Sequence, residues 1–164
     1  ARAGVAAIAA HTNLDAAQGG VNDALAGALG LTDVQTAPDG ISRIGHLPAA
    51  LPPAAFAALA MDRLGAPAVQ WRAGERPVET VALCSGAGAA FMHSLLDQAD
   101  AFLTGELKYH DWPRTAATVV AAGHFHTEIG IVAPLARRLA EAFPSLLVET
   151  AKESCPYSVL VRRK

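Results

Sequence analysis

His124 and Glu128 are the two residues whose types and spacing point most directly to chemistry. They stand four positions apart where the pattern predicts the start of a helix, so both side chains project from one face. An imidazole nitrogen and a carboxylate oxygen are common ligands of zinc, manganese and iron. The pair therefore predicts a divalent-metal site. The structural alternative is that Thr127 and Glu128 cap the helix while His124 is a loop residue.

Asp15 is the candidate for a further metal ligand. It ends the segment His11-Thr12-Asn13-Leu14-Asp15, which follows a short apolar run. A carboxylate can bind through both oxygens, so Asp15 could bridge two ions. An aspartate in such a place also serves as a turn or cap residue. His11 either lies beside the metal or has only a structural role, as does Thr127 next to Glu128.

Glu106 and His110 are candidates for moving protons. Both follow an expected strand at Ala101–Leu103, and each could approach the metal from the end of that strand. Carboxylates and imidazoles are the usual general acids and bases of enzymes. His110 with Asp111 could instead cap a helix.

These candidates can meet only if the strands before them lie in one sheet. Each candidate segment follows a short apolar run typical of a buried strand, at Val5–Ala10, Ala101–Leu103 and Val119–Ala122. Parallel strands open their carboxyl ends on the same edge of a sheet, where α/β proteins bind ligands. The sequence therefore predicts that the three segments converge.

The other expected elements alternate in the same way. Further strands are expected at Ile41–Leu47, Val69–Arg72, Val78–Cys84 and Leu146–Glu149. Helices are expected at Val21–Leu29, at Ala54–Leu64, from the residue after Gly88 to about Gln98, and at Thr127–Phe143. Strand, turn, helix and strand at this spacing predict an α/β fold with a mixed or largely parallel sheet flanked by helices.

A glycine-rich turn, Ser85-Gly86-Ala87-Gly88, follows one of these strands. It matches neither the Rossmann nor the P-loop pattern. It either offers backbone N–H groups to an anion or is simply a tight strand-to-helix turn, and the second interpretation is favoured. Nothing near Cys84 would lower the pKa of its thiol, so a nucleophilic role is not expected.

Composition narrows the class of protein. The chain has 164 residues, 52% hydrophobic and 17% charged, which suits one globular region. A net charge of −2 with scattered signs makes a nucleic-acid partner unexpected. No apolar run reaches the roughly 18 residues of a membrane span. Two widely spaced cysteines favour a reducing, cytoplasmic location.

Three motifs in order resemble one known family, the NGG-one-interacting-factor-three-like proteins. The motifs are His11-Thr12-Asn13-Leu14-Asp15 with Gly19-Gly20-Val21-Asn22-Asp23, then Thr104-Gly105-Glu106-Leu107-Lys108-Tyr109-His110, then Gly123-His124-Phe125-His126-Thr127-Glu128. The resemblance implies a dinuclear metal centre in an α/β fold, often in a homohexamer, and members are known as GTP cyclohydrolase type 2 homologues. It makes Asp15 the bridging aspartate and His124 and Glu128 metal ligands, with His11 and Glu106 beside the metals.

One departure limits this resemblance. The family has a His-His-Pro motif before these segments, and no adjacent pair of histidines occurs here. Residues 1–164 are therefore expected to be a single α/β region, the C-terminal part of a larger family fold. The stretch Gly30–Arg76 is too short for the domain that some members insert.

The functional hypothesis is metal-dependent hydrolysis of a small molecule or nucleotide, with zinc, manganese or iron as the metal. The alternative is a non-catalytic metal-binding scaffold or regulatory interaction protein. In either case the expected partner is a further copy of the chain.

Overall fold

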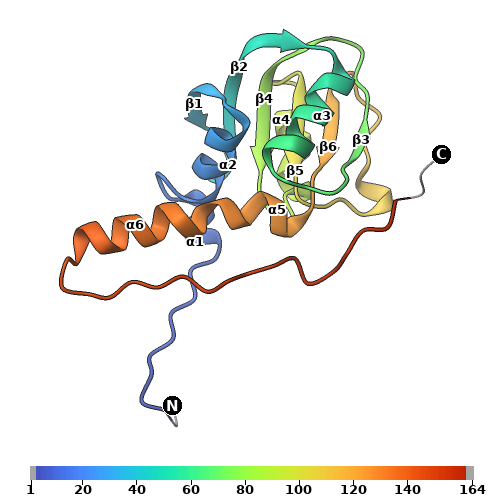
Figure 1. The fold of residues 1–164 in the computed structure, drawn as a ribbon. Coiled ribbons are helices and arrows are strands. Elements are labelled where there is room, and N and C mark those ends of the chain that lie inside the picture. Colours follow the sequence, from blue (N-terminus) through green and yellow to red (C-terminus); the bar gives the residue numbers. More distant parts are fainter. Residues whose placement is uncertain (1–2, 162–164) are drawn as a thin grey trace.

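The computed structural model describes residues 3–161, which form a six-stranded mixed sheet flanked by helices (Figure 1). The strand order is β1-β2-β4-β5-β6-β3. The strands are β1 (Thr32–Thr36), β2 (Arg43–Leu51), β3 (Gln70–Arg72), β4 (Val78–Cys84), β5 (Ala101–Thr104) and β6 (Thr118–Ala121). The central strands β4, β5 and β6 are parallel, and the outer pairings are antiparallel. The expected α/β fold with a mixed sheet is confirmed.

The parallel strands are the most deeply buried strands of the sheet. Every residue of β5 and β6 is buried, as are the last four residues of β4. Strands covered on both faces need such continuous apolar runs. Cys84 pairs with Thr104, and Thr104 pairs with Ala121, so the three carboxyl ends are level. The loops that follow them therefore open side by side.

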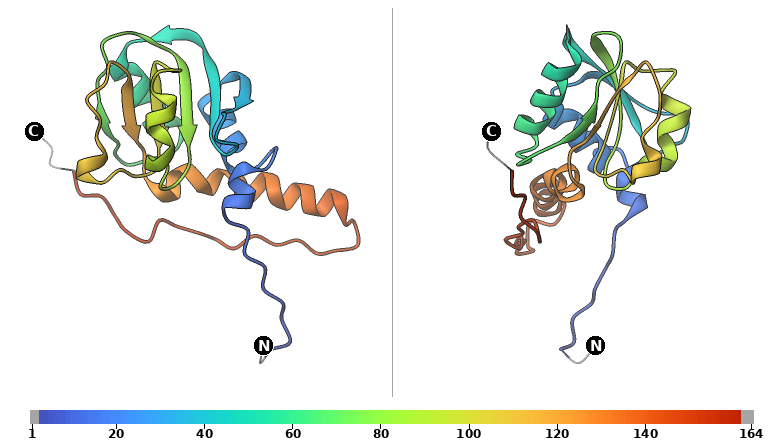
Figure 2. Two further views of the ribbon diagram at one scale, coloured as in Figure 1. Left: turned by 180° about the vertical axis from the view of Figure 1, so that it is seen from behind. Right: turned by 90° about the vertical axis from the view of Figure 1, so that its right-hand side faces the viewer.

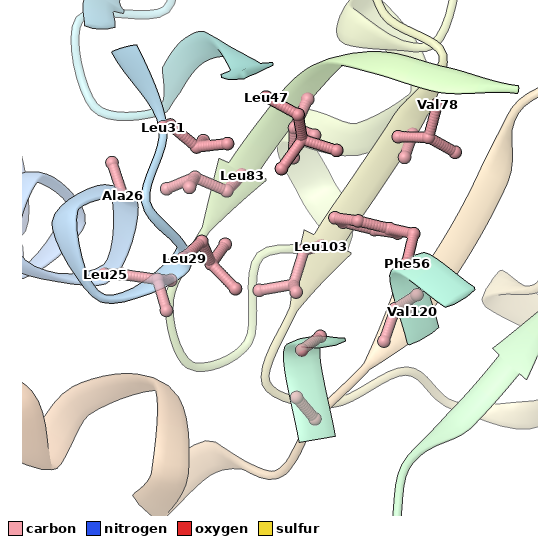
Figure 3. Close-up of a cluster of buried hydrophobic side chains, with 14 of the residues drawn as sticks. Leu25, Ala26, Leu29, Leu31, Leu47, Phe56, Val78, Leu83, Leu103 and Val120 are labelled. Atoms are coloured by element: carbon pink, nitrogen blue, oxygen red, sulfur yellow. The ribbon is translucent and has the colours of Figure 1, made fainter. Parts of the chain in front are cut away.

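Helices cover both faces of the sheet. They are α1 (Thr12–Ala16), α2 (Val21–Leu29), α3 (Pro53–Arg63), α4 (Ala89–Leu95), α5 (His124–Glu128) and α6 (Val132–Ala142), with 3₁₀ turns η1 (Tyr109–Asp111) and η2 (Ile129–Ile131). α2 and α3 pack on one face through Leu25, Leu29 and Phe56 (Figure 3). α4 covers the other face through Met92 and Leu95, and Figure 2 shows α3 and α4 on opposite sides.

Two expected strands are absent. Val5–Ala10 and Leu146–Glu149 are extended and largely exposed, and neither pairs with another strand within residues 3–161. Figure 1 shows the first leading away from the sheet and the second running back beneath α6. Apolar runs predicted both strands, but a strand also requires a partner for its backbone N–H and C=O groups. Those predictions were therefore wrong for this structure.

The expected helix Thr127–Phe143 is divided into α5, η2 and α6. Gly130 lies in the 3₁₀ turn, where a glycine lowers the preference for a continuous helix. Within residues 3–161 no helix has the length and apolar character needed to span a membrane.

Candidate metal centre

His124 lies between two carboxylates. Its Nε2 is 3.0 Å from Oε1 of Glu128, and its Nδ1 is 3.4 Å from Oε1 of Glu106. His124 and Glu128 come from α5, directly after β6, whereas Glu106 follows β5. The level ends of two parallel strands thus bring together three side chains that the sequence singled out.

The contact between His124 and Glu128 has the spacing of two ligands of one ion. Donor atoms about 2.0–2.2 Å from a metal, at angles of about 90–110°, lie roughly 2.9–3.4 Å from each other. Glu106 then occupies the place of the carboxylate that commonly accepts the other ring N–H of a ligating histidine. The same distances also suit direct contacts of the imidazole with the two carboxylates, without an ion between them.

Asp15 lies on α1, at the same end of the sheet as α5 (Figure 1). It is half-buried, and this burial raises the pKa of its carboxyl, while the positive fields of His11 and His124 act in the opposite direction. Asp15, His11 and Glu128 line one cavity of about 310 Å³. Asp15 and Glu128 therefore line the same open, mainly apolar space.

These residues fit a divalent ion in chemistry but form only part of a coordination shell. Two carboxylates and an imidazole are suitable donors for zinc, manganese or iron. Within residues 3–161, however, no group of three or more His, Cys, Asp or Glu side chains is arranged to hold an ion together. The described residues thus provide one pair of adjoining donors, His124 and Glu128, with the carboxylate of Glu106 on the other side of the His124 ring.

The glycine-rich turn after β4 supports the histidine side of this centre. Gly86 has a φ of +59°, and a Cβ there would collide with Oε1 of Glu128 and lie 3.0 Å from Nε2 of His124. Only glycine combines this backbone conformation with such a close approach. The turn is the surface against which the two candidate ligands rest.

The backbone N–H groups of this turn are already used within the protein. Ser85 N donates to Asn22 Oδ1 at 2.8 Å, Gly86 N to Thr127 Oγ1 at 3.1 Å, and Gly88 N to Thr104 Oγ1 at 3.0 Å. These three donors are therefore not free to bind a phosphate. The structure favours the tight-turn interpretation of Ser85-Gly86-Ala87-Gly88 over the anion-binding one.

Thr127 is a buried neighbour of the candidate ligands. Its hydroxyl accepts the Gly86 N–H and lies 2.9 Å from the carbonyl oxygen of His124 and 3.2 Å from that of Gly123, to one of which it donates. The side chain is 2% exposed. It links the first turn of α5 to the turn after β4.

A buried polar network, to which the sequence motifs assigned no chemical role, supports α1. Asn22 is fully buried and donates to the carbonyl oxygens of Asp15 and Ile41 at 3.2 and 2.9 Å. Arg43, 2% exposed, pairs with Asp23 and donates to the carbonyls of Ala16 and Ala17. The sequence motif Gly19–Asp23 pointed to Asn22 and Asp23. Nothing in the sequence predicted that Arg43 on β2 would be buried.

The remaining candidates are more peripheral. The His110 ring is exposed and packs edge-on against Tyr109, with ring centroids 5.2 Å apart. A cavity of about 640 Å³ is lined by Glu106, Lys108 and Asp111. Glu106 therefore contacts His124 and also lines this cavity. His110, four residues further along the chain, is exposed.

The segment after α6 turns back and runs beneath that helix toward the side of α5 (Figure 1). Glu153 lines the cavity that contains Asp15, and Tyr157 lines a cavity of about 330 Å³ that contains Glu106 and His124. No motif pointed to either residue.

The chain is similar to several known proteins. A family profile described as Duf34/NIF3 (NGG1p interacting factor 3) matches residues 1–156. The chain is 30% identical over 145 residues to a GTP cyclohydrolase 1 type 2 homolog of Lactococcus lactis, covering 81% of this chain and 56% of the relative. It is 38% identical over 136 residues to the homolog of Streptomyces coelicolor, covering 73% and 48%. The chain thus spans about half the length of these relatives.

Solved structures show the same fold. A hypothetical protein of Staphylococcus aureus superposes with a TM-score of 0.84 at 21% identity, covering 93% of this chain and 68% of that one. A Thermus thermophilus protein gives a TM-score of 0.68 at 31% identity, covering 87% and 60%.

Proposed function

This chain belongs to the Duf34/NIF3 family, and from that premise we propose that it contributes ligands to a divalent-metal centre. The observation that carries the proposal is the position of His124 between Glu106 and Glu128, at 3.4 and 3.0 Å. Glu128 and His124 would bind the ion, Asp15 would bridge two ions in a complete centre, and Glu106 would hold the His124 ring. His11 and Thr127 would support these ligands from beside the metal.

The most suitable activity for such a centre is hydrolysis. A divalent ion of this kind, zinc, manganese or iron, lowers the pKa of bound water and polarises a substrate. Glu106 would accept a proton because its carboxylate reaches both His124 and the neighbouring cavity. His110, on the same loop, is the second proton-transfer candidate. The name of the relatives, GTP cyclohydrolase 1 type 2 homolog, suggests a nucleotide as the first substrate to test.

Metal analysis of the purified chain tests the proposal. We expect zinc, manganese or iron in the wild type and its loss from an Asp15→Ala/His124→Ala double variant. Equal metal content in the two proteins would remove the central claim. If metal is present but GTP and other nucleotides are not turned over across a broad metal screen, the hydrolase assignment fails while metal binding stands.

A non-catalytic scaffold is the second candidate. It is favoured by α6, whose residues are not buried and whose exposed Leu139 is typical of an interaction surface. A structural ion stabilises the folded state by mass action, so its removal lowers the melting temperature strongly. We therefore propose to compare melting temperatures before and after chelation. A large fall supports the scaffold, whereas a small fall together with metal-dependent turnover supports the catalytic role.

Assembly with further copies of the chain, up to a hexamer, completes the proposal. No residue of α6 is buried, and Leu139 and the following Phe143 remain exposed. An amphipathic helix with an uncovered apolar side is typical of an interface. Light scattering coupled to size exclusion would measure the assembly. The free cysteines, Cys84 and Cys155, suit the reducing cytoplasm that we propose as its location.

A further inference from the structure

The two sides of the candidate metal centre meet at one turn of the backbone. On the first side, the buried amide of Asn22 donates to the carbonyl oxygen of Asp15 and accepts the N–H of Ser85. The distances are 3.2 and 2.8 Å. One side chain thus joins the helix that carries Asp15 to the end of β4.

On the second side, Thr127 does the same for α5. Its hydroxyl accepts the N–H of Gly86 at 3.1 Å and lies 2.9 Å from the carbonyl oxygen of His124. Ser85 and Gly86 are consecutive residues. Asp15 and His124 are remote in sequence, yet each is connected to this turn through one buried side chain.

We propose that the Ser85-Gly86 turn is the common anchor that sets the distance between Asp15 and His124, and that Asn22 is a positioning residue of the metal centre. This inference rests on the proposed function. Within residues 3–161 Asn22 makes no hydrogen bond to a candidate ligand side chain, and it acts through the backbone of Asp15. Both of its N–H groups have acceptors, because the second reaches the carbonyl oxygen of Ile41 at 2.9 Å. The orientation of the amide is therefore fixed.

A purely structural role for Asn22 makes a different prediction. Loss of a buried hydrogen-bonding group lowers stability wherever it occurs. A positioning role also changes the metal centre while the protein remains folded. Partners that orient ligands from outside the coordination shell typically change metal affinity about 10–100-fold.

The test compares Asn22→Ala with a matched buried control. Thr118 is fully buried, and its hydroxyl accepts the N–H of Gly74 at 3.1 Å, at the opposite end of the sheet from the centre. Thr118→Val therefore removes a buried hydrogen bond without touching the turn. Binding of Co²⁺ alone is titrated by its visible absorption in each variant, at a temperature where circular dichroism shows the fold intact. We expect at least a tenfold loss of affinity in Asn22→Ala and less than a twofold change in Thr118→Val.

A second measurement needs no metal. Nitroxide labels are attached at Thr12→Cys on α1 and Gly130→Cys in η2, in a Cys155→Ser background, and their separation is measured by pulsed EPR with chelator present. A side chain at Gly130 meets nothing within 4 Å. We expect Asn22→Ala to broaden the distance distribution and Thr118→Val to leave it unchanged. Thr127→Val is the second variant, expected to broaden it by releasing α5.

The outcomes separate the inference from the proposed function. If the wild type binds no Co²⁺ but Asn22→Ala broadens the distance, the metal proposal fails and the common anchor stands. If the distance distribution stays narrow in both Asn22→Ala and Thr127→Val, the anchor is overturned. Equal losses of affinity in Asn22→Ala and Thr118→Val would show a role in stability only and would also overturn it.

Discussion

The groups that position the candidate centre and the groups that would do its chemistry are built in opposite ways. The backbone of Asp15 is held by the Asn22 network, which we define as Asn22, Asp23 and Arg43. Asn22 and Arg43 are almost fully buried. The His124 cluster, defined as Glu106, His124 and Glu128, has side chains that are 41–61% exposed. Position is thus fixed by buried groups whose hydrogen bonds are used within the protein. Exposed groups, which a ligand can still reach, are left for chemistry.

The largest effect on stability is expected in the Asn22 network. Arg43→Met removes the ion pair with Asp23 and leaves the carbonyls of Ala16 and Ala17 without that donor. Breaking a buried pair by removing one partner costs roughly 3–5 kcal/mol of unfolding free energy. Urea unfolding followed by circular dichroism measures this loss.

Arg76→Met is the matched control for that experiment. Arg76 pairs with Asp100 at 3.0 Å, but its side chain is 54% exposed. An exposed pair contributes about 0–1 kcal/mol. Equal losses in Arg43→Met and Arg76→Met would show that the buried network does not hold α1 in place.

The next largest effect is expected where the turn meets the His124 cluster. Gly86→Ala places a methyl group against Glu128 and His124 in a left-handed conformation, while Gly40→Ala meets the same kind of φ, +77°, with nothing within 4 Å. Both substitutions carry backbone strain of about 1–3 kcal/mol. Only Gly86→Ala should also reduce metal content. Metal analysis with urea unfolding of both variants separates crowding from strain, and an equal metal content would contradict the role given to the turn.

The same contrast explains what the sequence predicted. The parallel strands β4, β5 and β6 were predictable because burial on both faces requires unbroken apolar runs. His124, Glu106 and Glu128 were found together because the level strand ends dictate it. Arg43 could not be predicted, since its burial depends on carbonyl groups distant in sequence.

Val5–Ala10 is a segment for which the sequence predicted structure that does not form. Its apolar pattern is that of a strand, yet it has no strand partner within residues 3–161. A local pattern specifies what a segment can form, and the available neighbours decide whether it forms. The polar strand β1 illustrates the converse, because pairing with β2 organises residues without an apolar run.

A small effect on stability, with a large effect on metal, is expected in the His124 cluster. His124 is 44% exposed, so His124→Ala should change the unfolding free energy of the metal-free protein by less than about 0.5 kcal/mol. Metal binding should be abolished. Glu106→Gln keeps the shape of the side chain that holds the ring, and we expect about a tenfold weaker affinity. Calorimetric titration with Zn²⁺ measures both, and a His124→Ala protein that binds as tightly as wild type would exclude this cluster as the site.

The smallest effect should come from Asp15 and should depend on pH. Burial raises the pKa of its carboxyl, so the folded protein holds this proton more tightly than the unfolded chain does. The resulting stabilisation is fully present below the unfolded value of about 3.9, and it is lost as pH rises through the raised folded pKa. Asn cannot ionise, so metal-free wild type should lose stability relative to Asp15→Asn across this window. Asp62→Asn, at an exposed carboxylate, controls for the change of charge.

Excess Zn²⁺ at neutral pH should make wild type more stable than Asp15→Asn. Only the ionised Asp15 can bind the ion, and binding stabilises the folded state. Unfolding free energies measured with and without the ion test both signs. A difference between wild type and Asp15→Asn that ignores both pH and Zn²⁺ would mean that Asp15 is neither desolvated nor a ligand. The Asn22 network would then position a backbone turn alone.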